Sequence, residues 1–260
     1  MPIVSRLSIA PVKGLALEHP DEIELTGQGV REDRRFFLVD DTGRLIDGLL
    51  AGRLVQVKAH IDPDGSHLRI TFPDGRVVED DVRPTEPMIT RMYGRMVLGH
   101  LVDGPWAEAL QPFTGRRVHL IRTNRPGGTR EKHAATLITD GSLDLLGAHL
   151  GGGPVDGRRF RMLIELTGGA AHEEDGWIGG RIELGETVML ISKQVARCAI
   201  TTQDPDSGVR DLDTLRTIIS YRGLRDGENV DFGVYGEVER AGRIRVGDEV
   251  RLLDAVGRSA

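Results

Sequence analysis

The chain contains one cysteine, Cys198, and its neighbours give this residue a setting that suits thiolate chemistry. The guanidinium of Arg197, directly before it, favours the thiolate, which is both a nucleophile and a soft metal ligand. Thr201 and Thr202 follow, and then the turn-forming segment 204–208, Asp-Pro-Asp-Ser-Gly. This pattern predicts a reactive or metal-binding thiol beside a loop.

The segment upstream of the cysteine predicts its position in the fold. Residues 186–192 are rich in β-branched and apolar residues, which is typical of a strand, so Cys198 is expected where this strand ends. An unpaired cysteine is also often only a small buried hydrophobic residue, and that alternative stays open. One cysteine can form neither an intramolecular disulfide nor an iron–sulfur cluster.

Composition limits the class of protein. The net charge of −6 over 260 residues argues against nucleic acid as the main partner. The N-terminus lacks the apolar core of a signal peptide, and no run approaches the roughly 18 apolar residues of a spanning helix. We therefore predict a cytoplasmic protein without membrane attachment.

Short alternating runs separated by Gly, Pro and Asp turns predict a mainly β fold with short helices, of the α+β class. The loop at 123–128 is expected to lead into a second half. Helices are expected at 104–110, 143–150 and 211–219. Strands are expected at 3–10, 22–25, 33–40, 54–61, 67–72, 76–78, 118–121, 136–138, 158–166, 186–192, 232–238 and 242–252.

Several stretches, in order along nearly the whole chain, resemble the MOSC domain family. They are 11–14, 33–40, 159–161, 174–179, 197–208, 232–235 and 246–248. The second half resembles the MOSC domain itself, and the first half resembles the β-barrel domain that often precedes it. The resemblance implies an N-terminal MOSC-associated β-rich domain at 1–122 and a MOSC β-barrel domain at 123–260.

The family includes the amidoxime-reducing components, and its members bind a pterin-based molybdenum cofactor. The resemblance implies that Cys198 is the molybdenum ligand and the catalytic residue. Basic side chains and the start of a helix are expected to hold the phosphate of the cofactor. The implied cofactor-binding residues are Lys13, Arg34, Thr139, Ser142, Arg159, Arg161, Arg197, Thr201 and Tyr235. At the level of the family, the resemblance also implies pyridoxal phosphate binding.

The sequence departs from the family where Arg-Phe-Arg is usually followed by Pro-Asn. Here Met162 and Leu163 follow, so one polar contact to a cofactor is missing. If 158–166 is a strand, alternation lets only one of Arg159 and Arg161 face a given side, and Arg161 matches the family position better. The acidic cluster at 172–175 has no zinc-ligand spacing and is interpreted as a solvated loop.

The resemblance implies a molybdenum oxidoreductase that reduces N-hydroxylated small molecules. Its electrons are expected from a separate protein, an iron–sulfur protein or a haem protein with a flavin reductase, because the chain has no second cysteine. Two alternatives stay open. The first is a sulfur-carrier or cofactor-handling protein with a persulfide on Cys198. The second is an enzyme without molybdenum on a repurposed MOSC scaffold.

Overall fold

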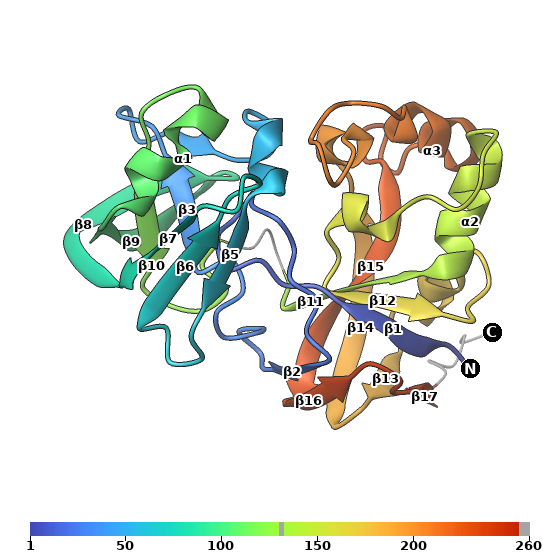
Figure 1. Ribbon diagram of the computed structural model, residues 1–260. Coiled ribbons are helices and arrows are strands. Elements are labelled where there is room, and N and C mark those ends of the chain that lie inside the picture. Colours follow the sequence, from blue (N-terminus) through green and yellow to red (C-terminus); the bar gives the residue numbers. More distant parts are fainter. Residues whose placement is uncertain (130–132, 255–260) are drawn as a thin grey trace.

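The computed structural model describes residues 1–129 and 133–254, which form two β-rich units side by side (Figure 1). Strands dominate both units, and the three α-helices among these residues are short, so the predicted fold class is confirmed. In the described residues, no helix is long and apolar enough to cross a membrane. The predicted division of the chain between residues 122 and 123 stays a prediction.

The first unit contains a five-stranded sheet of order β4-β3-β10-β9-β8 and a three-stranded sheet of order β5-β6-β7. Its core surrounds Trp106, whose buried indole N–H donates to the carbonyl of Leu68 at 3.0 Å. The elements are β3 (Phe36–Val39), β4 (Leu45–Ile46), the 3-10 helix η1 (Gly52–Gln56), β5 (Lys58–Ile61), β6 (His67–Thr71), β7 (Val77–Asp81), β8 (Arg83–Met92), β9 (Arg95–Asp103), α1 (Trp106–Thr114) and β10 (His119–Thr123).

The second unit contains a seven-stranded sheet of order β1-β12-β11-β15-β14-β13-β17, and a two-stranded sheet joins β2 to β16. Both β1 and β2 come from the start of the chain. The elements are β1 (Ile3–Leu7), β2 (Glu22–Leu25), β11 (Ala135–Thr139), α2 (Asp140–His149), η2 (Gly157–Phe160), β12 (Ile164–Thr167), η3 (Glu173–Trp177), β13 (Arg181–Leu184), β14 (Thr187–Ala196), η4 (Ala199–Thr202), α3 (Thr214–Arg222), β15 (Asp231–Arg240), β16 (Gly242–Arg245) and β17 (Val250–Asp254).

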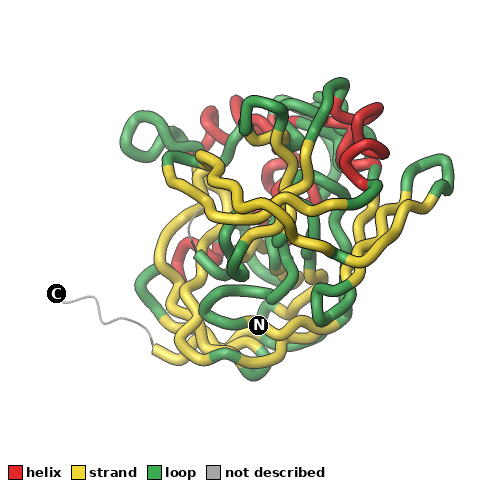
Figure 2. Tube along the Cα trace, turned by 90° about the vertical axis from the view of Figure 1, so that its left-hand side faces the viewer, coloured by secondary structure: helices red, strands yellow, loops and turns green. Residues whose placement is uncertain are grey.

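The seven-stranded sheet curls so that its two edges meet. The amide of Val4 donates to the carbonyl of Asp248 at 2.9 Å, and the amide of Val250 donates to the carbonyl of Pro2 at 2.9 Å. Figure 2 shows the strands of the molecule in yellow, several of them strongly curved. Pairing of these edges satisfies backbone groups that an open sheet would expose to water.

Several predicted strands were wrong in extent, and three of them differ most. The prediction at 158–166 covers η2 and only then β12, because the Asp156 carboxylate accepts the amide N–H of Arg158 at 2.9 Å and Arg161 is left-handed, with φ of 51°. The prediction at 54–61 begins inside η1. The prediction at 242–252 is interrupted by a turn at Gly247, where φ is 95°.

Candidate functional site

A cavity of about 430 Å³ is lined by residues of both units, and Cys198 is one of them. The thiol is exposed, and its residue follows β14 and directly precedes η4. The predicted position of the cysteine at the end of a strand is therefore confirmed. An exposed thiol that opens into a cavity can reach a ligand, which a buried structural cysteine cannot.

Six of the residues predicted for the site line this one cavity, although they come from segments far apart in the sequence. They are Lys13, Arg34, Arg161, Arg197, Cys198 and Tyr235. Four of the six are basic. The cavity thus combines one thiol with a concentration of positive charge, which suits a ligand that carries both a soft metal and an anionic group.

The side chain of Arg34 holds the backbone of Arg161 in place. Both have left-handed backbones, with φ of 53° and 51°, a conformation that bulky residues rarely adopt. The Arg34 guanidinium donates to the carbonyl of Arg161 at 3.0 Å and pairs with Asp33 at 2.5 Å. The Arg161 guanidinium donates to the carbonyl of Leu15 at 2.7 Å.

Burial strips water from the Arg161 guanidinium, and Arg34 adds a repelling charge. Together they lower the pKa of Arg161 to about 10, with burial the larger cause. Asp33 and Asp47 attract this charge but do not cancel these effects. A desolvated cation next to a second cation is stabilised by an incoming anion, so this end of the cavity favours anionic ligands.

Lys13 and Arg197 contact different walls of the cavity. The Lys13 ammonium lies 3.5 Å from the carbonyl of Thr129 and 5.0 Å from the ring centroid of Tyr93. The Arg197 guanidinium donates to the Met162 sulfur at 3.2 Å and to the carbonyl of Phe160. Arg197 therefore holds the turn that carries Arg161, in addition to being next to Cys198 in sequence.

The structure places Thr139 and Ser142 away from the cavity, around the carboxylate of Glu174. The Thr139 hydroxyl lies 2.7 Å and the Ser142 hydroxyl 2.8 Å from its oxygens. Glu174 is fully buried, so the prediction of a solvated loop was wrong for this residue of the 172–175 cluster. Burial raises the pKa of Glu174 despite these hydrogen bonds.

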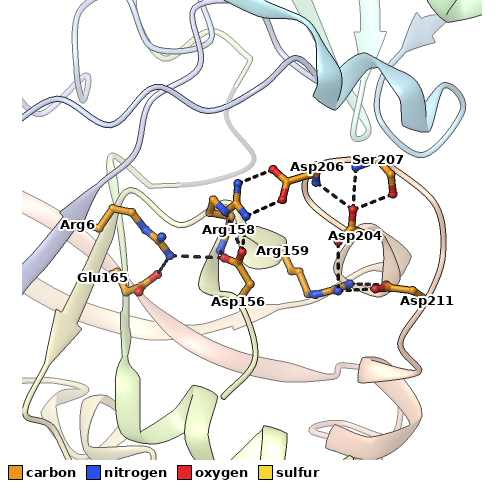
Figure 3. A network of polar contacts seen from close by, with 9 residues as sticks. All are labelled: Arg6, Asp156, Arg158, Arg159, Glu165, Asp204, Asp206, Ser207 and Asp211. Carbon is orange, nitrogen blue, oxygen red and sulfur yellow. Dashed lines mark hydrogen bonds and ion pairs between the residues drawn. The ribbon is translucent and has the colours of Figure 1, made fainter. Parts of the chain in front are cut away.

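Arg159 and Thr201 also lie outside the cavity wall, where they fix the segment that follows Cys198. Arg159 forms a bidentate ion pair with Asp211 at 2.6 and 2.7 Å and lies 3.8 Å from Asp204 (Figure 3). The Thr201 hydroxyl is buried and lies 2.8 Å from that of Thr214. The arginine is thus part of an ion-pair network rather than of the cavity surface.

The same network joins η2 to the turn at 204–208. Arg158 pairs with Asp206 at 2.7 Å and with Asp156 at 2.6 Å, while Asp204 accepts the amide and the hydroxyl of Ser207, both at 2.7 Å (Figure 3). Because η2 leads into Arg161 and the turn follows Cys198, the network fixes the two sides of the cavity relative to each other.

A half-buried histidine near Glu174 makes the stability of the fold depend on pH. Burial, and then the charge of Arg222, lower the pKa of His172 to about 4 from its usual 6.5. The unfolded chain takes up this proton near pH 6.5 and the native state only near pH 4. Stability therefore falls as the pH is lowered through this window, by about 1–2 kcal/mol after allowance for solvent screening.

We expect His172→Gln to remove this loss, so that wild type melts progressively lower relative to the variant between pH 6.5 and 4.5 in thermal unfolding monitored by circular dichroism. His67→Gln is the matched control of opposite sign, because a hydrogen bond with Asp81 raises the pKa of His67. That variant should lose stability relative to wild type as the pH falls. If the melting temperatures of His172→Gln and wild type changed in parallel with pH, the lowered pKa of His172 would not be the cause of the loss of stability.

Several cavity residues were not among the predicted site residues. Asp33 and Asp47 supply the carboxylates near the two arginines, and Leu49 and Tyr93 supply apolar surface from the first unit. Asp33 adjoins Arg34 in a stretch that resembles the family, so its position could have been inferred. Nothing in the sequence around Tyr93 indicated a site.

Family models match both units. The model of the MOSC domain matches residues 116–251, and the model of the MOSC N-terminal beta barrel domain matches residues 1–95. Among curated proteins, mitochondrial amidoxime-reducing component 1 of Mus musculus is 26% identical over 96% of this chain and 82% of its own length. Mitochondrial amidoxime reducing component 2 of Homo sapiens is 29% identical over 95% and 82%.

Among solved structures, the YUAD protein from Bacillus subtilis is similar, with a TM-score of 0.44 and 11% identity over 96% of this chain and 93% of that one. The curated relatives are mitochondrial by name, whereas the composition of this chain predicts a cytoplasmic location, which stays a prediction.

Proposed function

This chain belongs to the MOSC domain family, and from this membership we propose that it is a molybdenum-cofactor-binding oxidoreductase that reduces N-hydroxylated compounds. The observation that carries the proposal is the cavity shared by the exposed thiol of Cys198 and the desolvated guanidinium of Arg161. The amidoxime-reducing relatives, which match over nearly the whole chain, supply the reaction class.

The residues of the cavity fit the chemistry of the cofactor. A thiolate is a soft, strong donor for molybdenum, so Cys198 would be the protein ligand. Lys13, Arg34 and Arg161 would bind the phosphate of the pterin, since arginine forks match phosphate geometry. When bound, the cofactor would supply the two-electron chemistry that cleaves the N–O bond, with two protons taken up to give the amine or amidine and water.

The remaining wall residues determine what surrounds the reacting groups. Met162 and Leu163 stand where the family usually has Pro and Asn, and the Leu163 amide is already engaged by the Thr136 hydroxyl at 2.8 Å. Both side chains are buried in the apolar core, so this part of the wall offers no polar side-chain contact to a cofactor. Electrons would come from a separate iron–sulfur or haem protein with its flavin reductase. Pyridoxal phosphate binding stays a prediction.

The proposal is tested by the metal content of protein made in a host that synthesises the molybdenum cofactor. We expect near-stoichiometric molybdenum by mass spectrometry and reduction of benzamidoxime to benzamidine with a chemical electron donor. Absence of molybdenum, together with cyanide-labile sulfur on Cys198, would favour the sulfur-carrier alternative. Absence of both would favour a repurposed scaffold.

A further inference from the structure

Tyr93 lies in a tight turn whose backbone conformation is unfavourable for an aromatic residue. The hairpin of β8 and β9 closes with Met92 paired to Arg95, which leaves Tyr93 and Gly94 as a two-residue turn. Their φ angles are 50° and 80°, the left-handed pair that Asn-Gly adopts readily and that an aromatic residue adopts only at a cost. A bulky residue kept in such a conformation suggests a function for its side chain.

The hairpin presents this side chain to the cavity. Met92 is buried in a small core with Phe37, Val97 and Ile121, which fixes the base of the turn. Tyr93 lines the same cavity as Cys198, and the Lys13 ammonium lies 5.0 Å from the centroid of its ring. Half of the residue remains exposed, at 50%. The buried base of the hairpin therefore fixes the position of Tyr93, while part of the residue stays accessible.

We infer that Tyr93 is a substrate-positioning residue, whose exposed ring stacks on flat, conjugated substrates and orients their N-hydroxyl group toward the Cys198 side of the cavity. The inference rests on the proposed function. Aromatic stacking is favoured over aliphatic contact of similar area by a factor of about 3 to 10. Leu49 lines the same cavity and is 38% exposed, but its aliphatic side chain offers no such preference.

The test compares two probes of equal heavy-atom number, benzamidoxime, which is flat, and cyclohexanecarboxamidoxime, which is not. Their dissociation constants are measured by titration calorimetry on the protein isolated from a cofactor-competent host, and their KM values in the reductase assay. We expect wild type and Tyr93→Phe to bind the flat probe about 3 to 10 times more tightly. Tyr93→Leu and Tyr93→Asn should abolish this preference. Leu49→Ala should weaken the binding of both probes by the same factor.

Tyr93→Asn separates a binding role from a structural one. Asparagine tolerates a left-handed backbone, so the variant should melt at a higher temperature than wild type while losing the preference for the flat probe. An unchanged preference in Tyr93→Asn and Tyr93→Leu would overturn the inference. So would loss of molybdenum from Tyr93→Leu, which would assign the ring to the cofactor. If wild type lacks molybdenum and activity, the proposed function fails, and the calorimetric ratio still decides the role of Tyr93.

Discussion

Cys198→Ser is expected to lose its molybdenum and to reduce N-hydroxylated substrates more than about 100-fold more slowly than wild type. Serine differs by one atom, but its hydroxyl does not ionise near neutral pH and cannot supply the thiolate donor of the proposed site. The thiol is exposed, so its replacement leaves the packing and the melting temperature nearly unchanged. Molybdenum content by mass spectrometry and steady-state reduction of benzamidoxime measure the two effects.

Cys198→Ala, which has no donor atom, is the control and should match the serine variant in both measurements. Equal molybdenum in wild type and both variants would show that the cysteine is not the ligand. If instead wild type contains labile sulfur but no molybdenum, and both variants lack the labile sulfur, the thiol carries a persulfide. Because both variants should fold normally, low activity cannot be attributed to loss of structure.

The alternation of apolar residues was sufficient to predict the fold class and the position of the cysteine. All but the first residue of the run 186–192 lies within β14, and Cys198 comes two residues after the end of that strand. The hairpin of β8 and β9 gave no such signal, because Pro84 and Pro87 are unusual in strands and Ile89 and Leu98 face solvent. Tyr93 was therefore missed together with its hairpin.

Local capping explains why the arginine-rich segment was misassigned. The stretch 158–166 alternates like a strand, but the Asp156 side chain caps η2 and Arg161 turns left-handed. As a result the two arginines diverge: Arg161 lines the cavity, and Arg159 forms an ion pair with Asp211.

The burial of Glu174 was missed because its partners are distant in sequence. Thr139 and Ser142 precede it by 35 and 32 residues. Interactions at such separations are set by tertiary packing.

Arg161→Met is expected to weaken cofactor binding by about 10- to 150-fold, the range for loss of a hydrogen bond to a charged group. Methionine keeps the length and apolar stem of the side chain but removes the desolvated charge that an anionic group would neutralise. The cofactor affinity of Arg161→Lys should fall between those of wild type and Arg161→Met, because an ammonium restores the charge but not the planar fork. Retention of molybdenum after stepwise dialysis, measured by mass spectrometry, compares the three proteins.

The same substitution should change the stability of the cofactor-free protein by less than about 1 kcal/mol. Methionine removes the unfavourable burial and the repulsion from Arg34, which offset the lost hydrogen bond to Leu15. Arg69→Met is the matched control, because Arg69 pairs with Glu79 on the exposed surface of the first unit and does not line the cavity. This control should retain molybdenum. Equal retention by Arg161→Met and Arg69→Met would show that Arg161 does not bind the anionic end of the cofactor.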